Sequence, residues 1–434
     1  MVPGSSPGGP TKITGTFQTL SGDCQSLSRL KDFFSDRTLV NSALIVLSFV
    51  SVFILTSQSA ASYPTYLLAI AMLFSFRIWK GIFQQRILWT VMALLGWLVI
   101  SSLWSRPFEV RDLASVAARA LLVFLFVIAF AECQAQGLLN RWLGKSLVVA
   151  GMLAAVAAIW VFYGDSRPYV NRLRGLGQLH SGVIAALVYG VVLLFALDIV
   201  AETRERWWRV CSSLCACVMG YAIYLSDSRN AWVSVIMGIG VFALSTSVAQ
   251  KKRFVVLVGA MGLVTLGFLV ALVIDVDTRS MVLPRGDSNR LAIWTSTLEQ
   301  ISSGSVWIGL GINTSDNVTI AGREIFHPHS MYLSVFRQGG IVAITLFLML
   351  IWQTLAHLMA HYERREAKLA LGVLVIGLSA YVVDGHELID KVGSTWLLLW
   401  FPVSAALGFS GERPPTKIDK RSLTPGRLTD IKEK

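Results

Sequence analysis

Residues 180–200 read HSGVIAALVYGVVLLFALDIV, an apolar run long enough to cross the hydrocarbon core of a bilayer as one helix. Hydrophobic residues make up 54% of the 434-residue chain and charged residues only 15%, which excludes an ordinary soluble domain. We therefore predict an all-α polytopic membrane protein with about twelve transmembrane helices. The predicted spans are 39–57, 63–79, 87–104, 113–131, 146–163, 180–200, 207–225, 229–248, 254–275, 329–356, 366–384 and 393–410.

Basic residues in alternate loops fix the predicted orientation, because loops rich in Lys and Arg stay in the cytoplasm. The C-terminal tail is also basic, so both termini are expected there and the net charge of +12 is mostly topological. No nucleic-acid motif accompanies that charge, so no nucleic-acid partner is expected. The loop residues assigned to the inside are Arg77, Lys80, Arg86, Arg141, Lys145, Arg204, Arg206, Arg209, Lys251, Lys252, Arg253, Arg364, Arg365 and Lys368.

The predicted organisation is one transmembrane domain between two polar tails. Residues 1–38 have no apolar stretch typical of a signal peptide and are expected to be a disordered cytoplasmic tail. The transmembrane domain covers 39–410 and includes a large outer loop at 276–328, and residues 411–434 form a basic cytoplasmic tail. The fourth and fifth spans are the weakest prediction, because Arg119 interrupts one and the polar stretch 132–145 separates them. A miscount there would invert the second half.

Other basic residues fall in loops predicted to face outward, where positive charge is normally avoided. A single outer arginine usually anchors lipid headgroups. Several of them at the starts of helices favour an anionic ligand, for which a lipid-linked phosphate is the first choice. These residues are Arg167, Arg172, Arg174, Arg229, Arg285, Arg290, Arg323 and His329.

Three of these residues are predicted to lie in the first turn of a helix. Asp227 or Ser228 suits the N-cap of the eighth span, which puts Arg229 in its first turn. Arg290 begins a predicted amphipathic helix within the large outer loop. Pro328 suits the first position of the tenth span, and His329 follows it. The apolar spacing that predicts the amphipathic helix is that of Leu291, Trp294, Leu298 and Ile301.

Such helix starts suit one kind of ligand. Helix N-termini carry partial positive charge and free N–H groups, and they bind phosphates. The forked guanidinium groups of Arg229 and Arg290 could hold a pyrophosphate and stabilise it as a leaving group. The same positive helix end disfavours a protonated imidazole, so His329 is expected to be neutral and able to act as a base.

Further residues near this site have alternative interpretations. His327 could simply cap the helix or contact substrate. Asp384 and Glu387, at the outer end of the eleventh span, could orient His329 or replace it as the base. Three cysteines share one apolar span without His or carboxylate neighbours, so they are interpreted as packing residues and no metal site is expected.

Several segments resemble the O-antigen ligase family, in the same order along the chain. This family belongs to a superfamily that also includes O-antigen polymerases and O-linked oligosaccharyltransferases. The motif resemblance covers residues 170–345, and the helix layout extends it to about 39–410. The segments are Asn171-Arg172-Leu173-Arg174-Gly175, Ser228-Arg229-Asn230-Ala231-Trp232, Ser288-Asn289-Arg290-Leu291-Ala292-Ile293-Trp294, Gly309-Leu310-Gly311, and His327-Pro328-His329-Ser330-Met331-Tyr332-Leu333 through Gly339-Gly340.

The resemblance implies a GT-C-type glycosyltransferase in the bacterial inner membrane, with its active site facing the periplasm. Such ligases transfer O-antigen from undecaprenyl pyrophosphate to a sugar hydroxyl of lipid A-core, without metal, nucleotide or other cofactor. The resemblance assigns Arg229 and Arg290 to the donor pyrophosphate and His329 to the acceptor hydroxyl. Direct displacement would invert the anomeric configuration. Arg172, Arg174 and Arg285 are the remaining predicted substrate contacts.

Three other functions remain open at the level of sequence. An O-antigen polymerase would use the same donor with a second lipid-linked glycan as acceptor. A protein O-oligosaccharyltransferase would modify a Ser or Thr and often carries additional outer sequence, which this chain lacks. A lipid-linked sugar transporter should show inverted repeats and broken midplane helices, and no repeat is evident here.

Overall fold

The computed structural model describes residues 37–73, 82–137, 139–164, 172–247, 290–303, 305–314, 318–320, 323–325, 327–385 and 387–409. The predicted ninth span at 254–275 and both predicted tails therefore lie outside the described residues, apart from the first residues of α2. Within these ranges the fold is helical, with one short antiparallel hairpin of β1 (Val318–Ile320) and β2 (Arg323–Ile325). The periodicity did not predict this hairpin.

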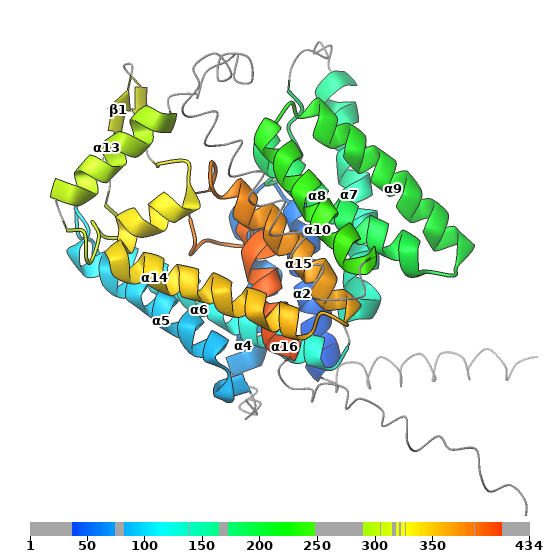
Figure 1. Cartoon of the computed structure of the whole chain (residues 1–434), viewed down its shortest axis with the longest axis horizontal. Coiled ribbons are helices and arrows are strands. Elements are labelled where there is room, and N and C mark those ends of the chain that lie inside the picture. The colour runs from blue at the N-terminus through cyan, green and yellow to red at the C-terminus, as the bar shows by residue number, and fades with distance from the viewer. Residues whose placement is uncertain are drawn as a thin grey trace, which may run out of the picture.

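Most of the described chain is helical (Figure 1). Seven of them are long and apolar enough to cross a membrane, which agrees with a multi-pass membrane protein. The count of twelve is not confirmed. The helices are α2 (Arg37–Ile54), α3 (Gln58–Ala61), α4 (Tyr63–Leu73), η1 (Ile82–Gln84), α5 (Arg86–Ser101), η2 (Ser102–Trp104), α6 (Val110–Ala135), α7 (Leu139–Gly164), α8 (Gly182–Glu202), α9 (Arg206–Leu225), α10 (Arg229–Ser247), α13 (Arg290–Ser303), α14 (Met331–Ala360), α15 (Arg365–Ala380), η3 (Trp396–Trp400) and α16 (Phe401–Phe409).

The fourth and fifth predicted spans are both long helices. Arg119 lies within α6 and does not interrupt it. The polar stretch at 132–145 is divided between the end of α6 and the start of α7, with a turn at Gln136 and Gly137. Helices α6 and α7 therefore occur where the fourth and fifth spans are predicted.

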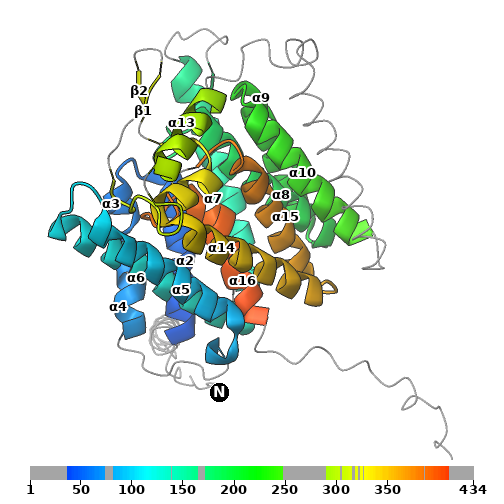
Figure 2. The ribbon, with the colours of Figure 1, turned by 60° about the vertical axis from the view of Figure 1, so that its left-hand side comes forward.

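Aromatic packing places the C-terminal helices at the centre of the bundle (Figure 2). Trp396 and Trp400 are fully buried, and the Trp396 ring lies 4.6 Å from that of Phe126 on α6. Large apolar side chains on the outer helices are instead exposed, as at Trp160 and Trp352. Exposed apolar surface of this kind suits contact with lipid.

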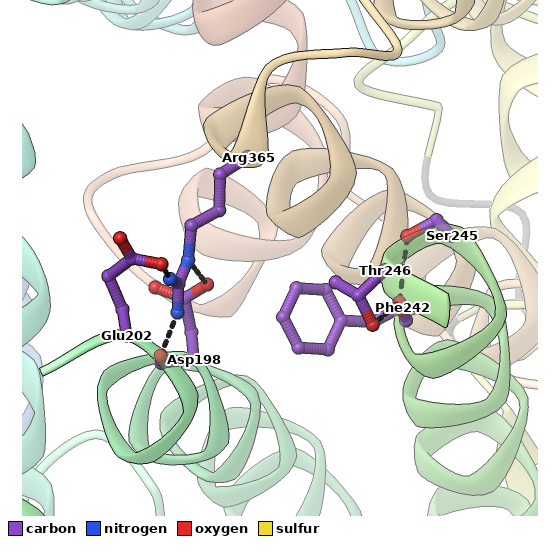
Figure 3. Close-up of polar contacts among 6 residues, drawn as sticks. All are labelled: Asp198, Glu202, Phe242, Ser245, Thr246 and Arg365. Carbon is purple, nitrogen blue, oxygen red and sulfur yellow. Dashed lines mark hydrogen bonds and ion pairs between the residues drawn. The ribbon is translucent and has the colours of Figure 1, made fainter. Parts of the chain in front are cut away.

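The loops assigned to opposite sides of the membrane gather at opposite ends of the helices. At the end predicted to face outward, Gln58 Nε2 donates to Asp390 Oδ2 at 2.9 Å, and Arg106 N donates to Thr314 Oγ1 at 3.2 Å. At the other end, Arg365 of α15 pairs with Asp198 and Glu202 of α8 (Figure 3). We refer to these as the outer end and the inner end.

Helix α14 is broken at Gly340, whose backbone has φ 65° and ψ −160°. Residues 305–314 dock into this break and satisfy the backbone groups that it frees. Leu310 N and Gly311 N donate to the carbonyls of Arg337 and Gln338 at 2.7 and 3.1 Å. Beyond the break, the N–H groups of residues 341 and 342 donate to the carbonyls of 306 and 307. Such pairing lets an interrupted helix persist inside a membrane protein.

Glycines make this docking possible. A Cβ on Gly309 would lie 2.6 Å from Gly340 N, and a Cβ on Gly340 would lie 2.3 Å from the carbonyl carbon of Trp307. Both glycines also have positive φ, which L side chains rarely adopt. The Gly309-Leu310-Gly311 and Gly339-Gly340 motifs thus fix the loop after α13 against α14.

Candidate functional site

Two helices of the outer end begin with the same local structure. Asp227 and His329 have a left-handed backbone conformation, with φ of 46° and 50°. Each is followed by a serine and then by the first helical residue. Ser228 Oγ accepts from Ala231 N at 3.4 Å, and Ser330 Oγ accepts from Leu333 N at 3.5 Å. Both serines therefore act as N-caps. Left-handed non-glycine residues are strained and are concentrated at functional sites.

This geometry confirms one predicted helix start and corrects another. Arg229 is the first residue of α10, with Ser228 as the cap. Pro328 does not begin α14, because Ser330 caps that helix and Met331 is its first residue. His329 therefore lies outside the helix. The left-handed backbone of His329 explains the difference, because a residue in that conformation cannot continue into a right-handed first turn.

The end of α15 holds these two helix starts together. Met331 N donates to Tyr381 O at 3.0 Å and to Asp384 O at 3.2 Å. Asn230 Nδ2, beside Arg229, donates to Ala380 O at 3.3 Å. Because 380 and 381 are consecutive, the starts of α10 and α14 are fixed to backbone atoms only about 4 Å apart.

Arg172 supports the turn in front of Arg229. Its Nε lies 3.8 Å from Asp227 Oδ2, and its Nη2 donates to the Asp227 carbonyl. The backbone of the same segment pairs with the end of α9, where Leu173 N donates to Leu225 O at 2.9 Å. Arg174 lies two residues further along and is exposed. Arg172 thus positions the start of α10, and its role as a substrate contact stays a prediction.

Helix α13, described from Arg290 onward, is attached to the His329 segment. Trp294 Nε1 donates to Pro328 O at 3.0 Å. Of the residues whose spacing predicts this helix, Leu291 and Leu298 are 50% and 48% exposed, whereas Ile301 is buried. The buried face is instead formed by Ile293, Thr297 and Ile301. The helix therefore carries exposed leucines in addition to its buried face.

An apolar groove opens beside the start of α14. It has a volume of about 520 Å³ and includes Trp294 and Leu298 of α13. Ser330, Phe336 and Val382 are among its other residues. The exposed apolar side chain of Leu298 therefore belongs to this groove.

A separate polar cavity of about 180 Å³ lies beside His327. Its lining includes Arg119 of α6, Arg337 of α14 and Glu387. The rings of His327 and His329 are in contact, with their centroids 4.1 Å apart. The segment carrying the two histidines thus borders the polar cavity at His327 and Pro328 and the apolar groove at Ser330.

The two predicted carboxylates occupy different places. Asp384 Oδ1 accepts from Gly385 N at 2.8 Å, while its carbonyl holds the start of α14. Glu387 lines the polar cavity and lies near Asp390. Burial, with Glu387 as a nearby like charge, raises the pKa of Asp390 to about 6.

The cavity contains arginines that the sequence reasoning did not assign to the site. Arg119 was noticed only as an interruption of a predicted span, and Arg337 was not singled out. A charged residue within an apolar span is itself the signal that could have identified them. Arg285 lies outside the described residues. Among the described residues, no group of three or more His, Cys, Asp or Glu side chains is arranged to hold a metal ion.

The fold is thus that of a multi-pass membrane protein. Arginines at helix starts and histidines just before a helix start lie at one end of it. Residues 214–348, which include α10, α13 and the start of α14, match the family model described as O-antigen ligase. The chain is 24% identical to an O-antigen ligase of Pseudomonas aeruginosa over 323 residues, covering 72% of this chain and 75% of that protein. It is 21% identical to a protein of Rickettsia felis named as a polysaccharide ligase, covering 67% of this chain and 74% of that protein. The chain is therefore similar to O-antigen ligases over the region that carries most of the predicted motifs.

Proposed function

We propose that this protein is an O-antigen ligase of the bacterial inner membrane. It transfers O-antigen polysaccharide from undecaprenyl pyrophosphate to a sugar hydroxyl of lipid A-core, at an outer end that faces the periplasm, with both termini in the cytoplasm. The observation that carries this proposal is the attachment of α10 and α14 to Ala380 and Tyr381, which brings the Arg229 and His329 segments together. The bond from Trp294 to Pro328 adds the helix that begins with Arg290.

In this proposal the donor binds through its charged and its apolar part. Arg229 and Arg290 hold the pyrophosphate at two helix N-termini, where the guanidinium forks and the helix dipoles favour the same charge. The apolar groove along α13 and α14 receives the part of the undecaprenyl chain nearest the pyrophosphate. The two arginines also stabilise the charge that develops on pyrophosphate as it leaves.

His329 takes the acceptor proton in this scheme. The acceptor oxygen attacks the anomeric carbon while the bond to pyrophosphate breaks, so the configuration inverts. Although His329 is not a helical residue, it immediately precedes the N-cap of α14 and remains near the positive helix end. Its contact with His327 restrains the ring.

Reconstituted transfer tests this function. Purified protein in vesicles is given O-antigen on undecaprenyl pyrophosphate, in excess chelator and without ATP, and is offered either lipid A-core or a second lipid-linked glycan. We expect product on lipid A-core with inverted configuration. Growth of the glycan on the second lipid-linked chain, with none on lipid A-core, would indicate the polymerase alternative and contradict the proposal.

A further inference from the structure

The polar cavity beside His327 contains two arginines that the proposed transfer does not use. Arg119 comes from α6 and Arg337 from the first half of α14, and Glu387 enters from the loop after α15. The lining also includes Asn313 of the segment docked into the helix break. Four separate parts of the chain thus build one polar site beside the segment that carries His327 and His329.

The position of Arg119 is unusual for a structural residue. It is the tenth residue of α6, so it lies about 13 Å along a helix that is long enough to span the membrane. An arginine at such a depth is costly, and those that occur usually face a water-filled cavity or a ligand. Arg119 lines the cavity in this way.

The opposite wall is buried and rich in hydrogen-bonding groups. Arg337 is only 8% exposed, and its Nη2 donates to Thr314 O at 3.3 Å. Ser334, one turn earlier, is 2% exposed and belongs to the same lining.

The charge of the cavity selects the ligand. Two guanidinium groups face one carboxylate, so the cavity favours an anion, and arginine forks suit phosphate or carboxylate oxygens. The volume of about 180 Å³ would hold on the order of a dozen waters, which is more room than a phosphate alone requires. A sugar ring with an anionic substituent fits both the charge and the size.

We propose that this cavity binds a phosphorylated or carboxylated sugar of the acceptor, adjacent to the sugar whose hydroxyl reaches His329. Arg119 and Arg337 hold the anionic group. The contact between His327, which lines the cavity, and His329 places this sugar next to the reacting hydroxyl. This inference rests on the proposed function, because it assigns a role within the same transfer reaction.

The kinetic test compares two acceptors that differ only in the anionic group. Lipid A-core with its phosphates and the same material after removal of the sugar phosphates are used by wild type, Arg119→Gln and Arg337→Lys. We expect Arg119→Gln to raise the acceptor KM about tenfold or more for the phosphorylated acceptor only, with donor KM unchanged. Arg337→Lys should keep the protein folded and give a smaller change in the same direction. Arg111→Gln, at an exposed position on the same helix, is the matched control.

A binding measurement separates this proposal from the proposed function. Glucose 6-phosphate and glucose are added to purified protein while its thermal unfolding is followed. Only glucose 6-phosphate should raise the unfolding temperature of the wild type. The rise should be absent in Arg119→Gln and present in Arg229→Gln. If the sugar phosphate stabilises Arg119→Gln as well as wild type, or if the variant's KM rises for the donor instead, the proposal is wrong. If the protein does not transfer glycan to lipid A-core but glucose 6-phosphate still stabilises it through Arg119, only the proposed function is refuted.

Discussion

The indole N–H of Trp294 donates to the carbonyl of Pro328 at 3.0 Å, which attaches the helix begun by Arg290 to the segment that carries His329. The Trp294 ring also lines the apolar groove. One side chain therefore connects the proposed donor site to the proposed base.

Trp294→Phe tests this connection, because it keeps an aromatic ring in the groove and removes only the hydrogen bond. Loss of one such bond typically costs about 1 kcal/mol. We expect kcat for transfer to fall roughly five- to tenfold while thermal stability changes little. Trp307→Phe, whose side chain is 69% exposed, serves as control and should retain full activity. Equal kcat in wild type and Trp294→Phe would show that the bond does not position the site.

The arginines at the helix starts should not tolerate lysine. Arg229→Lys and Arg290→Lys keep the charge but lose the planar fork, so each should lose most transfer activity, about tenfold or more. Activity is measured in membranes that contain equal amounts of folded protein. Arg111→Lys, exposed near the start of α6, should remain active. Near-normal transfer by both lysine variants would remove the role assigned to them.

The break in α14 depends on glycine at position 340. Gly340→Ala would place a Cβ 2.3 Å from backbone atoms of Trp307 and impose a left-handed conformation on alanine. The conformation alone costs about 1 kcal/mol or more, and the clash requires the docked segment to move. We expect a large loss of monodisperse protein in detergent. Gly96→Ala has no atom within 4 Å of the new Cβ and should behave as wild type.

Stability should fall as pH rises through the pKa of Asp390. Its folded pKa is raised to about 6 from an ordinary value of 3.8, so the folded protein binds more protons than the unfolded chain between these values. The unfolding temperature in detergent should therefore be higher at pH 5 than at pH 7.5. Asp390→Asn should flatten this dependence, whereas Glu299→Gln on the exposed face of α13 should leave it intact. An unchanged pH dependence in Asp390→Asn would assign the effect to another group.

The sequence predicted the helices well because a membrane span needs a long apolar run, and such runs are visible without knowledge of packing. It also predicted the start of α10, because the cap and the first-turn arginine are neighbours in sequence. It placed His329 in a helix wrongly, since Pro328 suits a helix start and nothing local reveals the left-handed backbone at position 329. The polar cavity was not predictable, because its lining residues Arg119 and Arg337 are far apart in the chain and only the folded helices bring them to one cavity.

The most direct test of the central claim is the effect of His329→Ala on donor binding and on the chemical step, measured separately. A base acts on the transfer step, whereas an anion ligand also acts on binding. We predict that His329→Ala binds the lipid-linked donor with near-normal affinity and that its single-turnover transfer to lipid A-core falls by about a hundredfold or more. His361→Ala, at the inner end, should transfer normally. Weak donor binding by His329→Ala with a normal transfer rate at saturating donor would contradict the account and make His329 a donor-binding residue.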